Sequence, residues 1–246
     1  MKRIAFLVSL CLVASLAACS RKNPAVNANS NASAQGVVAD AGAEAQTYLE
    51  RGKEFYRDDE DDKAVEAFQQ AIKLDPDLAE GHFRLGLAYD AMGLEQESDE
   101  SYKKAIDSYK KFFESEENSK NAEAHYNLAQ AYAGLSLYSE AVSEYRQAVR
   151  LKEDDADIYY DLGLALSRLA QYDEAAAAFE KSLELDPENY RAEDELAEAR
   201  EGIKRIRAGK KHQEDLLKKK KEAELKKQQE TGSPARFSNP EISRTP

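Results

Sequence analysis

The chain has 246 residues, of which 33% are charged and 42% are apolar, so its length allows one modest domain with tails. Its formal net charge of −12 is unevenly distributed. Residues 40–202 carry 41 acidic and 18 basic side chains, whereas residues 203–227 carry 11 basic and 4 acidic ones. This acidic body argues against nucleic acid as its partner.

The amino terminus has the layout of an export signal. Lys2 and Arg3 precede an apolar segment, Ile4–Leu16, whose thirteen residues are fewer than the roughly 20 that a membrane-spanning helix needs. The segment ends in Leu-Ala-Ala followed by Cys19, which is similar to the cleavage box of bacterial lipoproteins. This resemblance implies that residues 1–18 are a removable signal peptide and that Cys19 becomes the lipidated first residue.

Lipidation of Cys19 would make a membrane one partner of the chain, because several acyl chains anchor far more firmly than one. In enteric-type lipoproteins a residue other than Asp after the cysteine implies the outer membrane. The resemblance therefore places the chain in the bacterial cell envelope, facing the periplasm. The alternative is an ordinary secreted protein with a coincidental cysteine. Cys11 lies within the signal, so no disulfide is expected.

Residues 19–43 are rich in Asn, Ala, Ser and Gly and are expected to form a flexible tether. After them, one pattern recurs at a fixed spacing. Three pairs of residues are each 34 apart: Leu128 and Leu162, Ala141 and Ala175, and Tyr145 and Phe179. Earlier copies give four repeats, 45–78, 79–121, 122–155 and 156–189, of which the second is nine residues longer. Two amphipathic helices repeated at this period are typical of a solenoid.

Each copy holds a small residue at its eighth position and an aromatic residue at its twenty-fourth. The eighth positions are Gly52, Gly86, Ala129 and Gly163, and the aromatic residues are Phe68, Tyr102, Tyr145 and Phe179. Small residues let two helix backbones approach, the aromatic ring fills the gap, and stacking of the next hairpin completes the burial. This pattern resembles the tetratricopeptide repeat (TPR) family, although the usual tryptophan at position 4 is replaced by Tyr48, His82, His125 and Tyr159.

The resemblance implies an all-α, right-handed α-solenoid of about four TPR hairpins over residues 45–189. Residues 190–207 carry an apolar stripe and are expected to form a capping helix. Residues 208–230 are rich in lysine and form either a lone charged helix or a disordered stretch, and residues 231–246 should be disordered. The lysine-rich segment is either solvated or attracted to anionic lipid headgroups or to the acidic repeats.

A TPR stack offers a groove lined by the first helix of each hairpin, and this implies a protein or peptide client. In the family, positions 2, 5, 9, 12 and 13 face this groove, and positions 5, 9, 12 and 13 give the candidate groove residues Leu49, Lys53, Tyr56, Arg57, Phe83, Leu87, Tyr126, Gln130, Tyr160, Leu164 and Arg168. Aromatic residues would supply buried area, and the cations would fix register on carboxylates. The alternative is that Tyr126 and Tyr160 only pack between hairpins.

The nine extra residues of the second repeat prolong an apolar helical stripe through Tyr109, Phe112 and Phe113. One interpretation is that these extra turns pack on the next hairpin. The other is that the three aromatic residues form a secondary contact, a ledge for a partner.

The sequence contains no candidate catalytic constellation, and neither a cofactor nor a metal is expected. His82 and His125 occupy the same repeat position and should pack there, and His212 stands alone. The acidic run Asp58–Asp62 lacks the ligand spacing of a calcium loop and is expected to cap the helix that follows.

We therefore expect a non-enzymatic, membrane-anchored scaffold that binds a protein client in the cell envelope. Three alternatives stay open. The chain could resemble the TPR pilotins that help outer-membrane secretins or pilus machines to assemble. It could be an accessory adaptor of a peptidoglycan-processing enzyme. It could also be a passive structural lipoprotein without a dedicated client.

Overall fold

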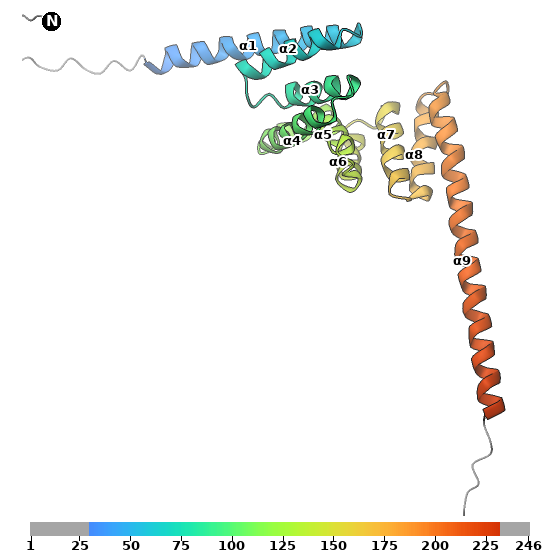
Figure 1. Ribbon diagram of the computed structural model, residues 1–246. Coiled ribbons are helices and arrows are strands. Elements are labelled where there is room, and N and C mark those ends of the chain that lie inside the picture. The colour runs from blue at the N-terminus through green and yellow to red at the C-terminus, as the bar shows by residue number, and fades with distance from the viewer. Residues whose placement is uncertain (1–29, 232–246) are drawn as a thin grey trace, which may run out of the picture. The chain divides into compact units, whose positions relative to one another are not determined.

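The computed structural model describes residues 30–231, so the predicted signal peptide, Cys19 and the tail beyond Thr231 lie outside the described residues. Over the described range the chain forms nine α-helices, one short 3-10 helix and no strand (Figure 1). Of the described residues, those from Ala41 onward belong to one compact unit, which contains the repeats. No helix in the described range is long and apolar enough to cross a membrane.

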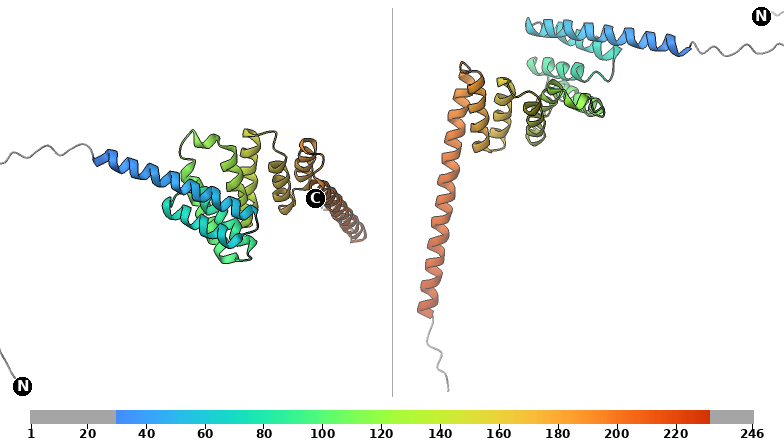
Figure 2. Two further views of the ribbon diagram at one scale, coloured as in Figure 1. Left: turned by 90° about the horizontal axis from the view of Figure 1, so that it is seen from above. Right: turned by 180° about the vertical axis from the view of Figure 1, so that it is seen from behind.

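The predicted all-α solenoid is confirmed. The helices are α1 (Ser30–Arg57), α2 (Asp61–Leu74), α3 (Ala79–Ala91), α4 (Glu95–Phe112), η1 (Asn118–Lys120), α5 (Ala122–Gly134), α6 (Tyr138–Leu151), α7 (Ala156–Arg168), α8 (Tyr172–Leu185) and α9 (Tyr190–Thr231). Each helix from α2 to α8 packs against the next α-helix along the chain (Figure 2). The odd-numbered helices α1, α3, α5 and α7 are the first helices of the four hairpins.

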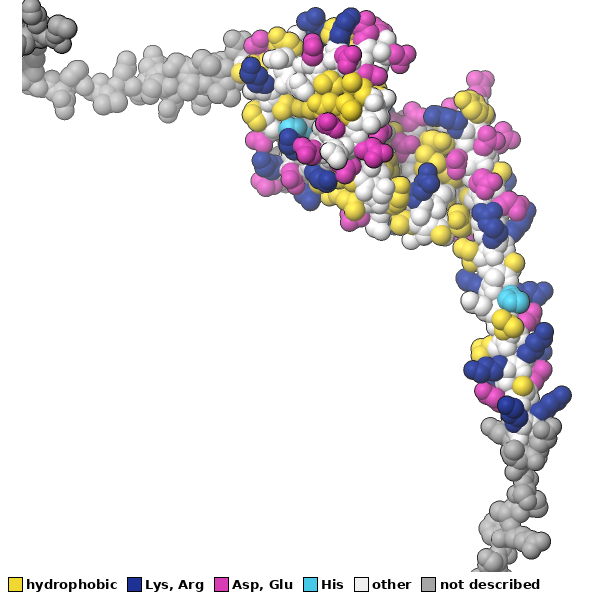
Figure 3. Space-filling view, viewed as in Figure 1, with side chains coloured by type: hydrophobic (Ala, Val, Ile, Leu, Met, Phe, Trp, Pro, Cys, Tyr) yellow, Lys and Arg dark blue, Asp and Glu magenta, His cyan; other side chains and the backbone are white. Residues whose placement is uncertain are grey.

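The two ends of the helical stack differ from the expected boundaries. Helix α1 begins at Ser30, so the expectation of a flexible tether is wrong for residues 30–43, where alternating alanines favour a helix. At the other end, the expected capping helix and the lysine-rich segment form one continuous helix, α9. Lys and Arg side chains gather along the exposed half of α9, whereas Asp and Glu are frequent over the repeats (Figure 3).

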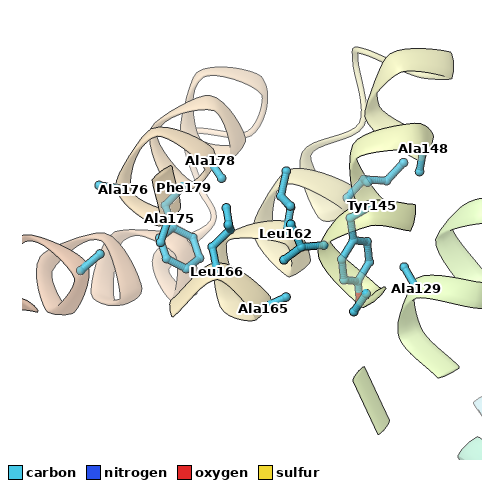
Figure 4. Packing of buried hydrophobic residues seen from close by; sticks show 14 of the residues in the cluster. Ala129, Tyr145, Ala148, Leu162, Ala165, Leu166, Ala175, Ala176, Ala178 and Phe179 are labelled. Atoms are coloured by element: carbon cyan, nitrogen blue, oxygen red, sulfur yellow. The ribbon is translucent and has the colours of Figure 1, made fainter. Parts of the chain in front are cut away.

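The pairing of a small residue with an aromatic ring explains why the hairpins close. Phe179 of α8 is fully buried, and a Cβ added to Gly163 of α7 would lie 2.5 Å from its ring. In the preceding hairpin Ala129 and Tyr145 are buried in the same cluster (Figure 4). The first hairpin repeats the arrangement, because a Cβ on Gly52 would lie 2.5 Å from the Phe68 ring. The helix backbones approach as closely as the ring allows.

The turn within each hairpin contains one residue with a left-handed backbone. The four residues all occupy position 15 of their repeats, and they are Asp59 (φ 56°), Gly93 (φ 72°), Ser136 (φ 58°) and Ala170 (φ 56°). Only glycine adopts this conformation without steric cost, so three of the four turns hold a strained residue. The repeat geometry is strong enough to impose the same turn on each sequence.

The acidic run Asp58–Asp62, which extends into the first turn of α2, makes no side-chain cap of the expected kind. Glu60 is the N-cap of α2, but its side chain makes no capping hydrogen bond and pairs with Lys63 at 2.8 Å instead. Asp61 and Asp62 lie in the first turn, where they face the positive end of the helix dipole. Side-chain capping occurs at α5 and α7, where Asn121 and Asp155 accept hydrogen bonds from backbone amides.

Candidate protein-binding groove

Neighbouring first helices form one surface, which we call the groove face; it comprises the outward side chains of α1, α3, α5 and α7 and of the start of α9. Two residues expected on this face are elsewhere. Leu49 and Phe83 have no exposed surface and belong to the core, so their assignment to the groove is wrong. The physical reason is that position 5 points toward the second helix of the same hairpin, as the 6.3 Å between the Phe83 and Tyr102 rings shows.

Tyr126 and Tyr160 occupy the same position but are only half-buried. The Tyr126 ring lies 5.9 Å from that of Tyr145, and the Tyr160 ring lies 5.9 Å from that of Phe179. Both rings therefore pack against the second helix of their own hairpin, whereas the alternative interpretation had them pack only between hairpins. Both side chains still reach the groove face, where Tyr126 contacts Asp161 of the next repeat and Tyr160 contacts Arg191 of α9.

The first contact between repeats is ionic. Lys53 of α1 pairs with Glu80 of α3 at 3.3 Å, and Arg84 pairs with the same carboxylate at 3.1 Å. Lys53 also pairs with Glu50 at 2.8 Å. Burial lowers the pKa of Lys53, but its hydrogen bonds and the charges of the two glutamates outweigh this and raise the pKa above its ordinary value. Lys53 is therefore a fixed positive charge on the groove face.

The second contact is a hydrogen-bonded triad across α5 and α7. The Tyr126 hydroxyl donates to Asp161 at 2.7 Å, and the Gln130 amide donates to the same oxygen at 3.1 Å. Burial raises the pKa of Asp161, and the two hydrogen bonds only partly offset this effect. Burial together with the Asp161 charge also raises the pKa of Tyr126. The triad holds a half-buried carboxyl group between α5 and α7 on the groove face.

Other predicted residues are less closely connected. Leu87 and Leu164 are half-buried and add apolar area, and Tyr56 is half-buried with a pKa raised chiefly by burial. Arg57 and Arg168 are exposed at the ends of α1 and α7. The structure thus brings Lys53, Tyr126 and Gln130 into contact with neighbouring repeats and leaves the two arginines at the edge.

Sequence reasoning missed four residues of this face: Glu80, Arg84, Asp161 and Arg191. The Arg191 guanidinium of α9 lies 5.0 Å from the centre of the Tyr160 ring. These residues stand at positions 2 and 6 of the 34-residue register. Positions 2, 6, 9 and 13 are separated by four, three and four residues and so share one face of a helix. The family pattern includes position 2, although its residues were not among the candidates, and this spacing could have identified position 6.

The extra turn of the second repeat packs on the third. Tyr109 is 3% exposed and lies in the core, so its expected role in a partner-facing ledge is wrong. Phe112 and Phe113 are half-buried against the same core, and Phe113 stacks on His125 with 4.2 Å between ring centres. The structure supports the interpretation that this segment packs on the next hairpin, because its aromatic residues fill the space between the second and third hairpins.

Two histidine side chains form hydrogen bonds with the backbone of the loops that connect hairpins. The Nε2 atom of His82 lies 3.0 Å from the Pro76 carbonyl oxygen, and that of His125 lies 3.1 Å from the Ser119 carbonyl oxygen. His125 also lies 2.7 Å from Glu144 through Nδ1. His212 is exposed on α9. Within the described residues, no group of three or more His, Cys, Asp or Glu side chains could hold a metal ion.

Comparisons with known families and structures agree with this geometry. A model described as a TPR repeat matches residues 52–93 and 137–169, and models described as the tetratricopeptide repeat match residues 79–112 and 156–189. No curated protein matches the chain significantly.

Similar solved structures include pilF of Pseudomonas aeruginosa, at 22% identity and a TM-score of 0.52, covering 65% of this chain and 69% of that chain. A structure of MamA AMB-1 has 22% identity and a TM-score of 0.51 over 73% and 98% of the two chains. Another MamA structure has 27% identity and a TM-score of 0.49 over 83% and 100%. The repeats of this chain are therefore recognised as tetratricopeptide repeats, and its fold is a TPR-like solenoid.

Proposed function

We propose that the chain is a scaffold that captures a protein or peptide client on its groove face. One observation supports this proposal: α1, α3, α5, α7 and α9 contribute cations, amides and aromatic rings to polar contacts between first helices and with α9. The linked contacts are Lys53–Glu80–Arg84, Tyr126–Asp161–Gln130 and Tyr160–Arg191. Extended surfaces of this kind are what repeat proteins use to bind partners.

The composition of the groove face favours a polypeptide. Half-buried apolar residues such as Leu87 and Leu164 alternate with charged groups, which suits a segment that presents both apolar and polar side chains. The groove offers hydrogen bonds, ion pairs and apolar area, so capture would be non-covalent. Aromatic and arginine side chains, such as Tyr160 and Arg191, are the residue types that dominate binding energies in such interfaces.

We further propose that Cys19 is lipidated and holds the scaffold in the bacterial cell envelope, at the outer membrane and facing the periplasm. The support is the sequence before Cys19, with its basic start, short apolar segment and Leu-Ala-Ala ending. Anchoring would confine the groove face close to one membrane and so raise its effective concentration for clients there.

The anchor is tested by replacing the cysteine. In cells, Cys19→Ser should abolish incorporation of a labelled fatty acid and move the chain from the membrane fraction to the soluble fraction. Cys11→Ser, inside the expected signal peptide, is the matched control and should leave both unchanged. Equal labelling of the Cys19→Ser variant and the parent chain would contradict the lipid anchor.

The scaffold role is tested with three arginine variants. Arg84→Ala and Arg191→Ala remove cations from the groove face, whereas Arg200→Ala removes an exposed ion pair with Glu180 on another surface. After chemical crosslinking in cells and isolation of the chain, client recovery should fall several-fold in the first two variants only. Equal recovery in all three would contradict the groove. A secretin subunit as client would favour an assembly role, and a peptidoglycan-processing enzyme would favour an adaptor role.

A further inference from the structure

The longer second repeat builds a cavity beside the groove face. Helix α4 has 18 residues, whereas α2, α6 and α8 have 14 each. Its additional turn carries Tyr109 and Phe112, and both line a cavity of about 290 Å³. The other lining residues come from the start of α3, the start of α5 and the turns before them. No other hairpin has the extra turn, so the cavity is particular to this repeat.

The lining of the cavity is acidic. Asp75, Asp77, Glu80 and Glu123 contribute four carboxylates, and no Lys, Arg or His is among the lining residues. Two of the four have cationic partners nearby: Asp77 pairs with Lys111 at 2.8 Å, and Glu80 pairs with Lys53 and Arg84. The pair with Lys111 is exposed on both sides and is therefore weak.

The other two carboxylates form no ion pair within 4 Å with any described residue, and Lys152 acts on Glu123 only at longer range. Asp75 accepts a hydrogen bond from the backbone amide of Asp77 at 3.2 Å. Glu123 stands exposed in the first turn of α5. Nearby cations neutralise the four carboxylates only in part. An arriving cation would therefore meet an excess of negative charge in this cavity.

An unsatisfied hydroxyl group lines the same cavity. Tyr109 is 3% exposed, and its hydroxyl completes no hydrogen bond, although the buried side chain of Asn127 lies beside it. Buried polar groups are almost always hydrogen-bonded, so an orphaned one marks a place where a partner can bind. A neutral phenol can accept a hydrogen bond from an ammonium or guanidinium group. Burial raises the pKa of Tyr109 and keeps it neutral.

We infer that this cavity receives a lysine or arginine side chain of the client peptide. The aliphatic stem would lie along Phe112 and Leu78, and the cation would meet Glu123, Asp75 and the Tyr109 hydroxyl. The volume lies just below the roughly 300–1,000 Å³ of small-molecule sites, which suits one side chain better than a complete ligand. This inference rests on the proposed capture of a peptide on the groove face, and it specifies one residue of that peptide.

The test uses the purified full chain, labelled with ¹⁵N-asparagine, and a defined probe. The probe is acetyl-Ala-Ala-Lys-Ala-Ala-amide, and its control carries norleucine, which keeps the stem and lacks the ammonium group. The lysine peptide should shift the side-chain amide signal of Asn127 in a saturable way that weakens at high salt. Equal shifts from both peptides, or no shift from either, would overturn the inference.

Two variants separate binding from folding. Glu123→Gln should weaken the lysine peptide about two- to fivefold, whereas Glu140→Gln, an exposed change in the first turn of α6, should not. Tyr109→Phe removes a hydroxyl that has no partner, so it should weaken the peptide about two- to tenfold without lowering the thermal midpoint. Unchanged peptide affinity in both cavity variants would also overturn the inference.

Failure of the cation-site inference can be distinguished from failure of the scaffold proposal. If a client crosslinks to the groove face but the lysine peptide does not shift the Asn127 amide signal, the scaffold proposal is supported and the cation-site inference is wrong. If the lysine peptide binds but no client reaches the groove face, the cavity binds cations and the scaffold proposal fails.

Discussion

The fifteenth position of each repeat shows how a single residue is held by the fold. Ala170, Ser136 and Asp59 adopt φ values of 56–58°, a conformation that brings Cβ close to the backbone and costs roughly 1–2 kcal/mol outside glycine. Gly93 occupies the equivalent turn of the second repeat without that cost. The packing of the two helices on either side of the turn supplies the compensating free energy.

Replacement of Ala170 by glycine should therefore stabilise the chain. We expect Ala170→Gly to raise the free energy of unfolding by about 0.5 kcal/mol, because relief of strain exceeds the added entropy of the unfolded chain. Ala177→Gly, at an exposed position within α8, is the matched control and should lower it by about 1 kcal/mol. Urea denaturation measures both values. If both glycine variants lost the same free energy of unfolding, the turn at Ala170 would carry no strain.

His125 is the residue whose charge should couple stability to pH. Both of its ring nitrogens face acceptors, Glu144 and the Ser119 carbonyl oxygen, so the doubly protonated ring satisfies both. Burial lowers its pKa, but these hydrogen bonds and the Glu144 charge outweigh burial and raise the pKa above 6.5. A raised folded-state pKa gives stabilisation that is complete below the unfolded value and is lost as pH rises through the folded value.

His125→Phe should keep the ring stack on Phe113 and lose the titration. We expect the stability difference between the parent chain and this variant to be larger at pH 5.5 than at pH 8.5. Chemical denaturation at the two pH values measures this difference. A pH-independent difference would mean that His125 contributes through packing alone.

At the scale of the element, the extended α4 is the departure from a regular repeat. Its last turn fills the space between the second and third hairpins through Tyr109, Phe112 and Phe113. The apolar stripe in the sequence predicted that the helix continues. It could not separate packing from partner binding, because either use needs the same aromatic residues at the same helical spacing.

Phe113→Ala should destabilise the chain by about 2 kcal/mol, because it removes a half-buried ring that stacks on His125. Lys110→Ala, exposed on the same turn, should change stability by less than about 0.5 kcal/mol. Thermal and urea unfolding measure both variants. A stable Phe113→Ala variant that had lost its client would instead restore the ledge interpretation.

At the scale of the whole molecule, the hairpins could be predicted from the sequence, but the groove face could be predicted only in part. Gly163 and Phe179 touch within one repeat, so the small-and-aromatic pattern records their contact directly. The contact between Tyr126 and Asp161 joins residues 35 apart in different repeats, and no repeated pattern records it. The family register placed Leu49 on the groove face although the fold buries it.

The central claim is that the groove face binds a client, and site-specific photo-crosslinking in living cells tests it most directly. A photoreactive residue at Leu164, half-buried on the groove face, is compared with one at Ala177, exposed on α8. The account predicts a specific adduct from Leu164 and none from Ala177. With the chain folded and present at normal levels, no adduct from Leu164, or the same adducts from both sites, would contradict it.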